Sequence, residues 1–321
     1  MPDDLNARAA EIVAKAVPLV IPPPICPISA AELLRMDIPL RDTLMDPFLP
    51  QQGGVLMFAP RGIGKTFMAL SLAYAVASGG TVMRWRAKAA RRVLYVDGEM
   101  PLASLQERLA GIAAGADHSP PDEDNFRLLP QDHYRDGLPD IASPEGRALI
   151  ERHAEGTDLV VLDNLSSLIR ARENEADDWQ PMQDLVLSLR RKGTSALLIH
   201  HAGKGGDQRG TSRREDIMDT VISLKRPDNY GAGRGAQFEV HFTKARGFTG
   251  ADAAPFMATL HKAADGALTW EASAPNADNR TTAHGMFTGG AKVPEVMKAL
   301  GLSKATAYRW HAEWKSGGGN G

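Results

Sequence analysis

The stretch that decides the fold is Val55-Leu56-Met57-Phe58-Ala59-Pro60-Arg61-Gly62-Ile63-Gly64-Lys65-Thr66. Its first four residues predict a short buried strand, and the apolar run at 67–76 predicts a packed helix. In such a loop the glycines let backbone N–H groups converge on phosphates, a lysine reaches the β- and γ-phosphates, and a threonine hydroxyl holds Mg²⁺. We therefore expect a nucleoside triphosphate and Mg²⁺ to bind at Ala59, Pro60, Arg61, Gly62, Ile63, Gly64, Lys65 and Thr66, although Ala59 stands where the usual pattern has its first glycine.

The composition is that of an ordinary globular protein. Of the 321 residues, 43% are hydrophobic and 24% charged, and the net charge is −2, so any nucleic-acid surface must be local. The single cysteine, Cys26, excludes an intramolecular disulfide framework and fits a reducing compartment. We find no signal peptide and no apolar run of about 18 residues, so we expect a cytoplasmic protein that does not span a membrane.

Apolar runs alternate with helical patterns along the middle of the chain, which predicts an α/β fold with a mainly parallel central sheet. The strands are expected at Val55–Phe58, Val93–Val96, Leu159–Leu162, Ala196–Ile199, Val221–Leu224 and Phe238–Thr243. The helices are expected at 66–78, 101–113, 144–155 and 178–192. A later pair, Ala258–Lys262 and Leu268–Glu271, predicts a β-hairpin across Asp265-Gly266.

Composition divides the chain into four parts. Residues 1–27 predict a short helix on a proline-rich tether, which could pack on its own domain or on a neighbouring subunit. Residues 28–274 form the expected α/β core, residues 275–290 a polar linker, and residues 291–321 a small helical unit with a flexible end.

Two acidic positions at strand ends are candidates for the chemistry. Asp163 follows four apolar residues, at the end of a strand where open α/β sheets bind ligands, and we expect it to support Mg²⁺. The residue after Asp163 is Asn164 rather than a glutamate, so the catalytic carboxylate does not lie directly beside Asp163 in the sequence. Glu99, after the strand ending at Val96, is our candidate to orient and deprotonate water, and Asp97 is its rival.

The run Ala196-Leu197-Leu198-Ile199 ends in two histidines whose side chains point to opposite faces. One of them can sense the γ-phosphate; we take His200 as the candidate and keep His201 as the alternative. A glycine-rich basic segment follows at 202–214, and it could bind DNA phosphates or be a plain solvated loop. Its candidate contacts are Lys204, Arg209, Arg213 and Arg214.

Two cations, Lys244 and Arg246, share one face at the end of a later strand. In a ring of subunits they could reach the γ-phosphate of a neighbour as an arginine finger, or they could simply be an exposed basic strand end.

Taken together, these features resemble those of the RecA-like hexameric P-loop ATPases and helicases. Within that family the chain is similar to the plasmid RepA type, an AAA-family ATPase, and its motor domain is similar to that of DnaB. The resemblance covers roughly residues 28–274 and rests on the phosphate loop, Asp97-Gly98-Glu99-Met100-Pro101, Asp163, the paired histidines and Lys244-Ala245-Arg246-Gly247-Phe248-Thr249-Gly250. It implies a homo-hexameric ring that hydrolyses ATP with Mg²⁺ and moves on single-stranded DNA. Glu99 would be the catalytic base, and Lys65 and Thr66 would bind phosphate and Mg²⁺. Lys244 and Arg246 would act on the adjoining subunit.

The last part of the chain predicts two short helices joined by a tight turn, which resembles the helix-turn-helix of resolvases and small regulators. Its second helix would contact duplex DNA through Lys304, Thr306, Tyr308 and Arg309. A hairpin that caps the domain or docks a partner is the alternative.

The sequence therefore favours an ATP-hydrolysing, ring-forming DNA helicase or translocase, acting in replication of a plasmid, phage or integrated element. Two alternatives stay open: a recombination or DNA-remodelling ATPase that does not unwind, and a DNA-binding regulator switched by ATP.

Overall fold

The computed structural model describes residues 25–170, 179–201, 214–227, 230, 235–275, 277–300 and 302–316. The residues form two compact units, 1–40 and 41–321. The predicted N-terminal helix within 1–20 lies outside the described residues.

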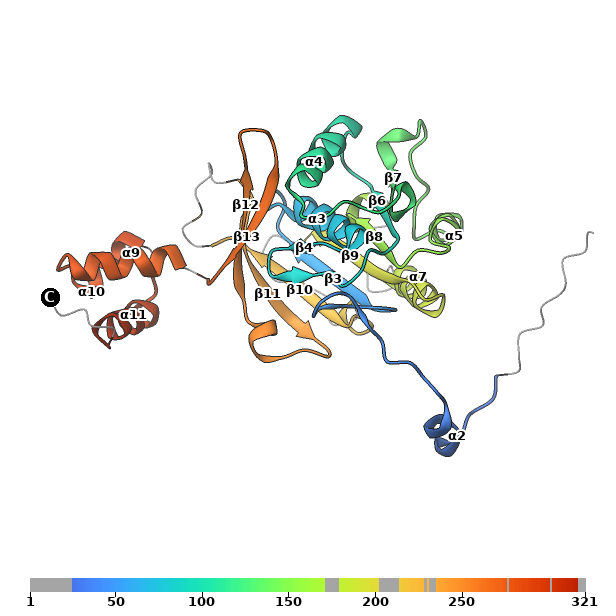
Figure 1. Cartoon of the computed structure of the whole chain (residues 1–321), viewed down its shortest axis with the longest axis horizontal. Coiled ribbons are helices and arrows are strands. Elements are labelled where there is room, and N and C mark those ends of the chain that lie inside the picture. The colour runs from blue at the N-terminus through green and yellow to red at the C-terminus, as the bar shows by residue number, and fades with distance from the viewer. Residues whose placement is uncertain are drawn as a thin grey trace, which may run out of the picture. The chain divides into compact units, whose positions relative to one another are not determined.

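The larger unit is organised on one nine-stranded sheet (Figure 1) in the order β13-β12-β11-β10-β3-β9-β8-β6-β7. Six neighbouring strands are parallel: β10 (Thr220–Lys225), β3 (Gly54–Ala59), β9 (Ser195–His201), β8 (Leu159–Asp163), β6 (Val93–Asp97) and β7 (Phe126–Pro130). The antiparallel strands β11 (Gln237–Ala245), β12 (Phe256–Lys262) and β13 (Leu268–Ser273) extend one edge. Since β9 lies between the phosphate-loop strand β3 and the strand that ends at Asp163, the fold is that of a RecA-like P-loop NTPase.

Alternation along the strands divides the core into two layers. Val55 and Met57 of β3 point to one face, where α3 (Lys65–Ser78) and α4 (Leu102–Gly115) pack. Leu56 and Phe58 point to the other face, where α5 (Pro144–His153) and α7 (Gln180–Arg191) pack. Because both faces are covered, the strands β3, β6 and β8 are buried along their whole length, and that explains their continuous apolar runs.

The predicted strands, the hairpin and the four core helices are confirmed, with ends shifted by a few residues at most. The edge strand β7 was not predicted, because its Phe-Arg-Leu-Leu-Pro sequence carries a charge and ends in proline. Several very short elements were not predicted either: β1 (Thr43–Met45), β2 (Leu49–Pro50), β4 (Thr81–Val82), β5 (Trp85–Arg86), α6 (Leu165–Leu168) and the 3₁₀ turns Glu123–Asn125, Gln131–His133 and Gly250–Ala253.

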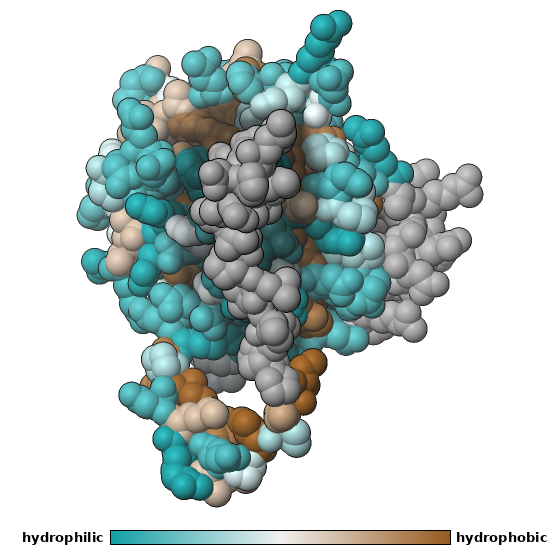
Figure 2. Space-filling model, turned by 90° about the vertical axis from the view of Figure 1, so that its right-hand side faces the viewer, coloured by the Kyte–Doolittle hydropathy of each residue, from teal (hydrophilic) through white to brown (hydrophobic). Residues whose placement is uncertain are grey.

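In the smaller unit the described residues hold one short helix, α2 (Ala30–Arg35). Ser29 caps it, since its hydroxyl accepts the Glu32 N–H at 3.2 Å and the Glu32 carboxylate accepts the Ser29 N–H at 2.7 Å. Several large apolar side chains of this segment are exposed, and Figure 2 shows apolar colour on the segment that carries α2.

The predicted polar linker at 275–290 is wrong in the structure, because most of it forms helix α9 (Ala277–Thr288). Helix α9 packs with α10 (Val293–Leu300) and α11 (Lys304–Ser316) around a core of their own. Ala283 and Phe287 on α9 supply part of that core. The helical unit therefore contains three helices rather than two.

Among the described residues, no helix combines the length and the apolar character needed to cross a bilayer.

We expect Trp310→Ala to unfold the three-helix unit and leave the sheet intact. Trp310 is 3% exposed in the core that the three helices share, and loss of a buried Trp side chain costs about 3–5 kcal/mol. A unit of about 40 residues has little stability to lose. Limited proteolysis should therefore show new cuts within 277–316 while ATPase activity persists. Tyr308→Ala on the exposed face of α11 is the control, and equal protease resistance of the two variants would contradict this expectation.

Candidate active site

The phosphate loop leaves β3 at Ala59 and enters α3 at Lys65. Gly62 and Gly64 have φ values of 71° and 112°, which favour glycine. A Cβ on Gly64 would lie 2.7 Å from the Cβ of Ala236, so the backbone before β11 also requires glycine there. Ala59, by contrast, is the buried last residue of a regular strand, where a methyl group packs in the core. The departure at Ala59 therefore leaves the loop intact.

The Lys65 ammonium is held by the loop itself. Its Nζ donates to the carbonyl oxygens of Ala59 at 3.0 Å and Pro60 at 2.9 Å. Burial lowers the Lys65 pKa to about 8, while the negative charges of Asp163 and Glu99 oppose that shift. A phosphate beside this ammonium would favour its charged form, so the site gains from an anionic ligand.

Asp163 is buried at the carboxyl end of β8 and is fixed by a hydroxyl group of the neighbouring strand. The Tyr95 hydroxyl on β6 donates to its Oδ2 at 2.6 Å. Burial raises the Asp163 pKa, whereas the Tyr95 and Thr66 hydroxyls and the Lys65 charge act to lower it. Thr66 and Asp163 thus present neighbouring oxygen donors of the kind that Mg²⁺ prefers, as the sequence predicts.

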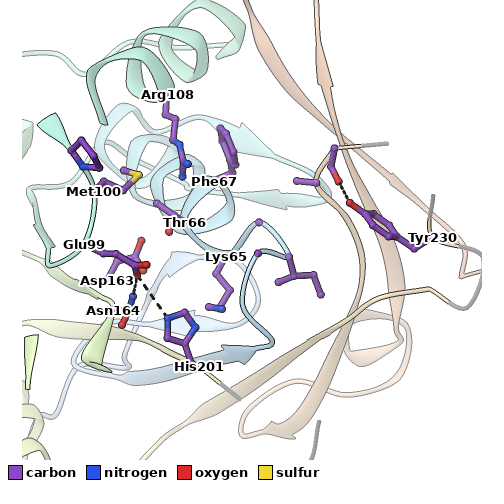
Figure 3. Close-up of a pocket in the computed structure, with 16 residues that line it drawn as sticks. Lys65, Thr66, Phe67, Glu99, Met100, Arg108, Asp163, Asn164, His201 and Tyr230 are labelled. Carbon is purple, nitrogen blue, oxygen red and sulfur yellow. Dashed lines mark hydrogen bonds and ion pairs between the residues drawn. The ribbon is translucent and has the colours of Figure 1, made fainter. Parts of the chain in front are cut away.

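The two rival carboxylates have different positions. Asp97 is buried and its Oδ1 accepts the N–H groups of Glu99 at 3.2 Å and Met100 at 2.8 Å, so it closes the turn after β6. Burial is the main cause that raises the Asp97 pKa to about 6. Glu99 instead projects into the cleft that the phosphate loop borders (Figure 3). This geometry favours Glu99 over Asp97 as the residue that faces a substrate.

Glu99 accepts a hydrogen bond from one side chain and faces a second. The Asn164 amide donates to its Oε2, and His201 Nε2 lies 3.8 Å from the same oxygen. Asn164 is itself anchored, because its Oδ1 accepts the Ser167 N–H at 3.2 Å and caps α6. Glu99 therefore has a defined direction although its side chain is 60% exposed.

The paired histidines separate as the alternation predicts, but the choice of His200 is wrong in this structure. His201 lines the cleft, whereas His200 is buried with its Nε2 2.6 Å from Nη1 of Arg214. Arg214 also lies over the Trp179 ring at 5.4 Å. Its guanidinium thus has partners within the protein, which argues against its predicted role as a DNA contact.

The cleft has a volume of about 550 Å³ and is completed by residues that the sequence analysis did not single out. Arg108 of α4 lies 4.4 Å from the centre of the Phe67 ring, and both line the cleft. Tyr230 lines it near the phosphate loop and stacks with Arg226, whose Nη2 bonds the Gly62 carbonyl at 3.3 Å. Tyr95, Asn164 and Arg108 face the site only because their strands and helices meet there, so no local pattern announces them.

Lys244 and Arg246 do not line this cleft. Because β11 runs antiparallel to β10, its last residues pair with the first residues of β10, at the sheet edge away from the phosphate loop. Lys244 Nζ bonds the carbonyl oxygens of Glu215 and Asp216, and Arg246 Nη2 bonds that of Asp216 at 3.3 Å.

The remaining predicted DNA contacts lie elsewhere. Lys204, Arg209 and Arg213 fall outside the described residues. Lys304, Thr306, Tyr308 and Arg309 are on α11. Thr306 serves the helix cap, since its N–H donates to the Ser303 hydroxyl at 3.2 Å and its own hydroxyl bonds Ser303 at 2.9 Å.

Residues 22–207 match the family described as the AAA domain. The chain belongs to this family. The match spans the phosphate loop, Glu99 and Asp163, so this AAA-domain protein is a nucleotide-binding P-loop ATPase.

Solved structures of similar fold include a KaiC-like protein from Pyrococcus horikoshii OT3 and the flagellar accessory protein FlaH from Methanocaldococcus jannaschii. The first is 16% identical with a TM-score of 0.49, over 71% of this chain and 93% of that one. The second is 12% identical with a TM-score of 0.46, over 66% of this chain and 87% of that one.

We expect Glu99→Gln to bind ATP normally and to hydrolyse it at least about a hundredfold more slowly. The amide keeps the size of the side chain but cannot take a proton from water, and such acid–base help contributes about 10²–10⁴ in rate. Asp97→Asn is the control, because its amide oxygen can still accept the two N–H groups of the turn. Single-turnover hydrolysis and nucleotide binding measured for both variants decide the assignment. Normal turnover by Glu99→Gln beside a dead Asp97→Asn would make Asp97 the base.

Proposed function

We propose that this AAA-domain protein is a ring-forming, ATP-hydrolysing motor that moves on single-stranded DNA, a helicase or translocase of the plasmid RepA type. The observation that supports a ring is the position of Lys244 and Arg246. These two cations lie too far from the nucleotide cleft of their own subunit to contact a phosphate bound there. The residues that open β11 lie against Gly64, and Lys244 follows seven residues after Gln237. At about 3.3 Å per residue, Lys244 and Arg246 lie roughly 25 Å from their own phosphate loop.

Two neighbouring cations at such a distance fit a role in a second subunit. Burial and the charge of Arg246 both lower the Lys244 pKa. An anion placed between them would relieve that repulsion. The γ-phosphate of an adjoining subunit is an anion that a ring would bring there, and a finger of this kind stabilises the charge that develops in phosphoryl transfer.

Within one subunit, the residues divide the work of hydrolysis. Glu99 would orient a water molecule and accept its proton, while Asn164 and His201 hold the carboxylate in place. Lys65 would exchange its two loop carbonyls for phosphate oxygens. Thr66 and Asp163 would hold Mg²⁺, which when bound neutralises phosphate charge.

The link to DNA is supported by the chain between the two histidines and Arg214. Residues 202–213 carry three cations, Lys204, Arg209 and Arg213. The segment starts directly after His201 in the cleft and ends at Arg214, which bonds His200. A backbone phosphate bound by this segment would thus act on both histidines of β9, which gives DNA a direct route to the ATPase site.

A DNA-binding regulator switched by ATP is the second candidate, and the exposed cations of α11 favour it. The position of Glu99 favours the motor, because a switch requires binding rather than rapid hydrolysis. Strand displacement on a forked duplex, with and without ATP, separates the candidates. Displacement that needs ATP and is lost in Glu99→Gln supports the motor. ATPase activity stimulated by single strands without displacement indicates remodelling, and a rate that no DNA alters contradicts a DNA motor.

We expect Arg246→Ala to fold and bind ATP but to hydrolyse it slowly, because arginine fingers contribute roughly 10³–10⁵ in rate. Mixing it with Lys65→Ala should restore part of the activity, since some interfaces then combine an intact cleft with an intact finger. Steady-state ATPase of mixtures over a range of ratios measures this. Native mass spectrometry should verify that the variants co-assemble. Mixed rings that show no rescue would contradict a role in trans.

A further inference from the structure

The three-helix unit at the C-terminal end has no part in the ATPase site. The described residues of α9, α10 and α11 share one apolar cluster, and none of the residues lining the nucleotide cleft comes from these helices. Its core consists of Ala283, Phe287, Val293, Val296, Ala307 and Trp310. The Trp314 indole N–H also donates to the Thr288 hydroxyl at 3.1 Å, which fixes the end of α9 on α11.

Hydrogen bonds of the described residues mark the end of α10 and the start of α11. The Leu302 N–H bonds the Met297 carbonyl at 3.0 Å and closes α10. The Ser303 hydroxyl then caps α11. Three helices with their own core, the last two joined by a tight turn, form the framework in which a helix-turn-helix presents its second helix to DNA.

Helix α11 has one exposed face opposite the packed one. Ala307 and Trp310 are buried against the other helices, whereas the exposed positions follow one another along the helix at steps of one or three residues. These exposed positions are Lys304, Ala305, Tyr308, Arg309, Ala312, Lys315 and Ser316. Two alanines let the backbone come close to a partner, and the three cations extend along the helix.

The charge of this face is not cancelled locally. Its acidic neighbour Glu313 is 3.0 Å from Arg280 of α9 and 4.0 Å from Arg309, so it is shared with a cation outside the face. Residues 277–316 hold six Lys or Arg and three Asp or Glu, a net charge of +3 in a chain whose total is −2. The unit is therefore one of the basic parts of a chain whose total charge is negative.

The geometry points to the exposed face of α11 as a binding site for duplex DNA, with this helix in the major groove. Lys304, Arg309 and Lys315 bind phosphates at the groove edges, and the Tyr308 hydroxyl and ring meet the base edges. Only one large apolar side chain is exposed among the described residues of α11, so the face lacks the apolar centre that a protein interface has. This site is separate from the proposed motor and does not depend on it.

The test compares two double variants of the full chain that carry the same charge change. Lys304→Gln with Arg309→Gln removes cations from the face. Lys292→Gln with Lys298→Gln removes two exposed cations of the same unit, outside α11. Binding of a fluorescent blunt duplex is measured without nucleotide across a salt series, together with a single strand of the same length. Thermal melting followed by circular dichroism verifies that both variants fold like the wild type.

We expect the slope of log K against log salt for the duplex to flatten by about 1.8 in the α11 variant, since each lost phosphate contact contributes about 0.9. The control should keep the wild-type slope and affinity. Identical slopes for the two variants would overturn the proposal, as a partner-binding or capping face would predict. Equal losses on the single strand and the duplex would overturn the assignment to the groove. Basal ATPase activity stays unchanged in either case, so the outcome is independent of the proposed motor.

Discussion

Lys65 and Asp163 are opposite charges buried at the same edge of the sheet, and the organisation of the site follows from keeping both there. Hydrogen bonds offset the cost of burying each group: Lys65 donates to two loop carbonyls, and Asp163 accepts from the Tyr95 hydroxyl. Parallel strands whose carboxyl ends meet at one edge bring these groups together. Burial disfavours the charged form of both side chains. A phosphate bound beside Lys65 and a Mg²⁺ ion bound beside Asp163 would each favour the charged form again, so the site suits a nucleotide that binds together with Mg²⁺.

Local pattern predicts this fold well because its main signals are local. Buried parallel strands are continuous apolar runs, and the Gly62 and Gly64 conformations mark the loop between the first strand and its helix. The contacts of Tyr95 and Asn164 could not be predicted, since they depend on β6 lying beside β8. For His200 and His201 the alternation predicts opposite faces, but only the packed helices decide which face holds the cleft. Helix α9 was missed because its Asn, Thr and Gly content disfavours a helix, and contacts of Ala283 and Phe287 stabilise it instead.

The antiparallel strand β11 makes the two ends of the parallel strands chemically different. Lys65, Glu99 and Asp163 lie at the carboxyl ends of the parallel strands, whereas β11 places Lys244 at their amino ends. One strand spans the distance: the residues that open β11 touch the phosphate loop at Gly64, and those that end it hold the cations. In the proposed ring, a γ-phosphate that binds Lys244 and Arg246 of one subunit would therefore act through a single strand on that subunit's own loop. Such an arrangement would couple neighbouring sites without a separate linking element.

The total charge of this chain is near zero, but the charge is distributed unevenly between its parts. The overall value of −2 combines a three-helix unit of +3 with a remainder that is more acidic than the total indicates. A net negative charge on the rest of the chain does not attract duplex DNA, so attraction depends on local basic places. The exposed face of α11 is such a place, and its cations have no task in the packing of the unit, which depends on Phe287 and Trp310. The packing of the unit does not require these cations, and few acidic residues lie near them. A polyanionic partner that binds this face would explain why they are gathered there.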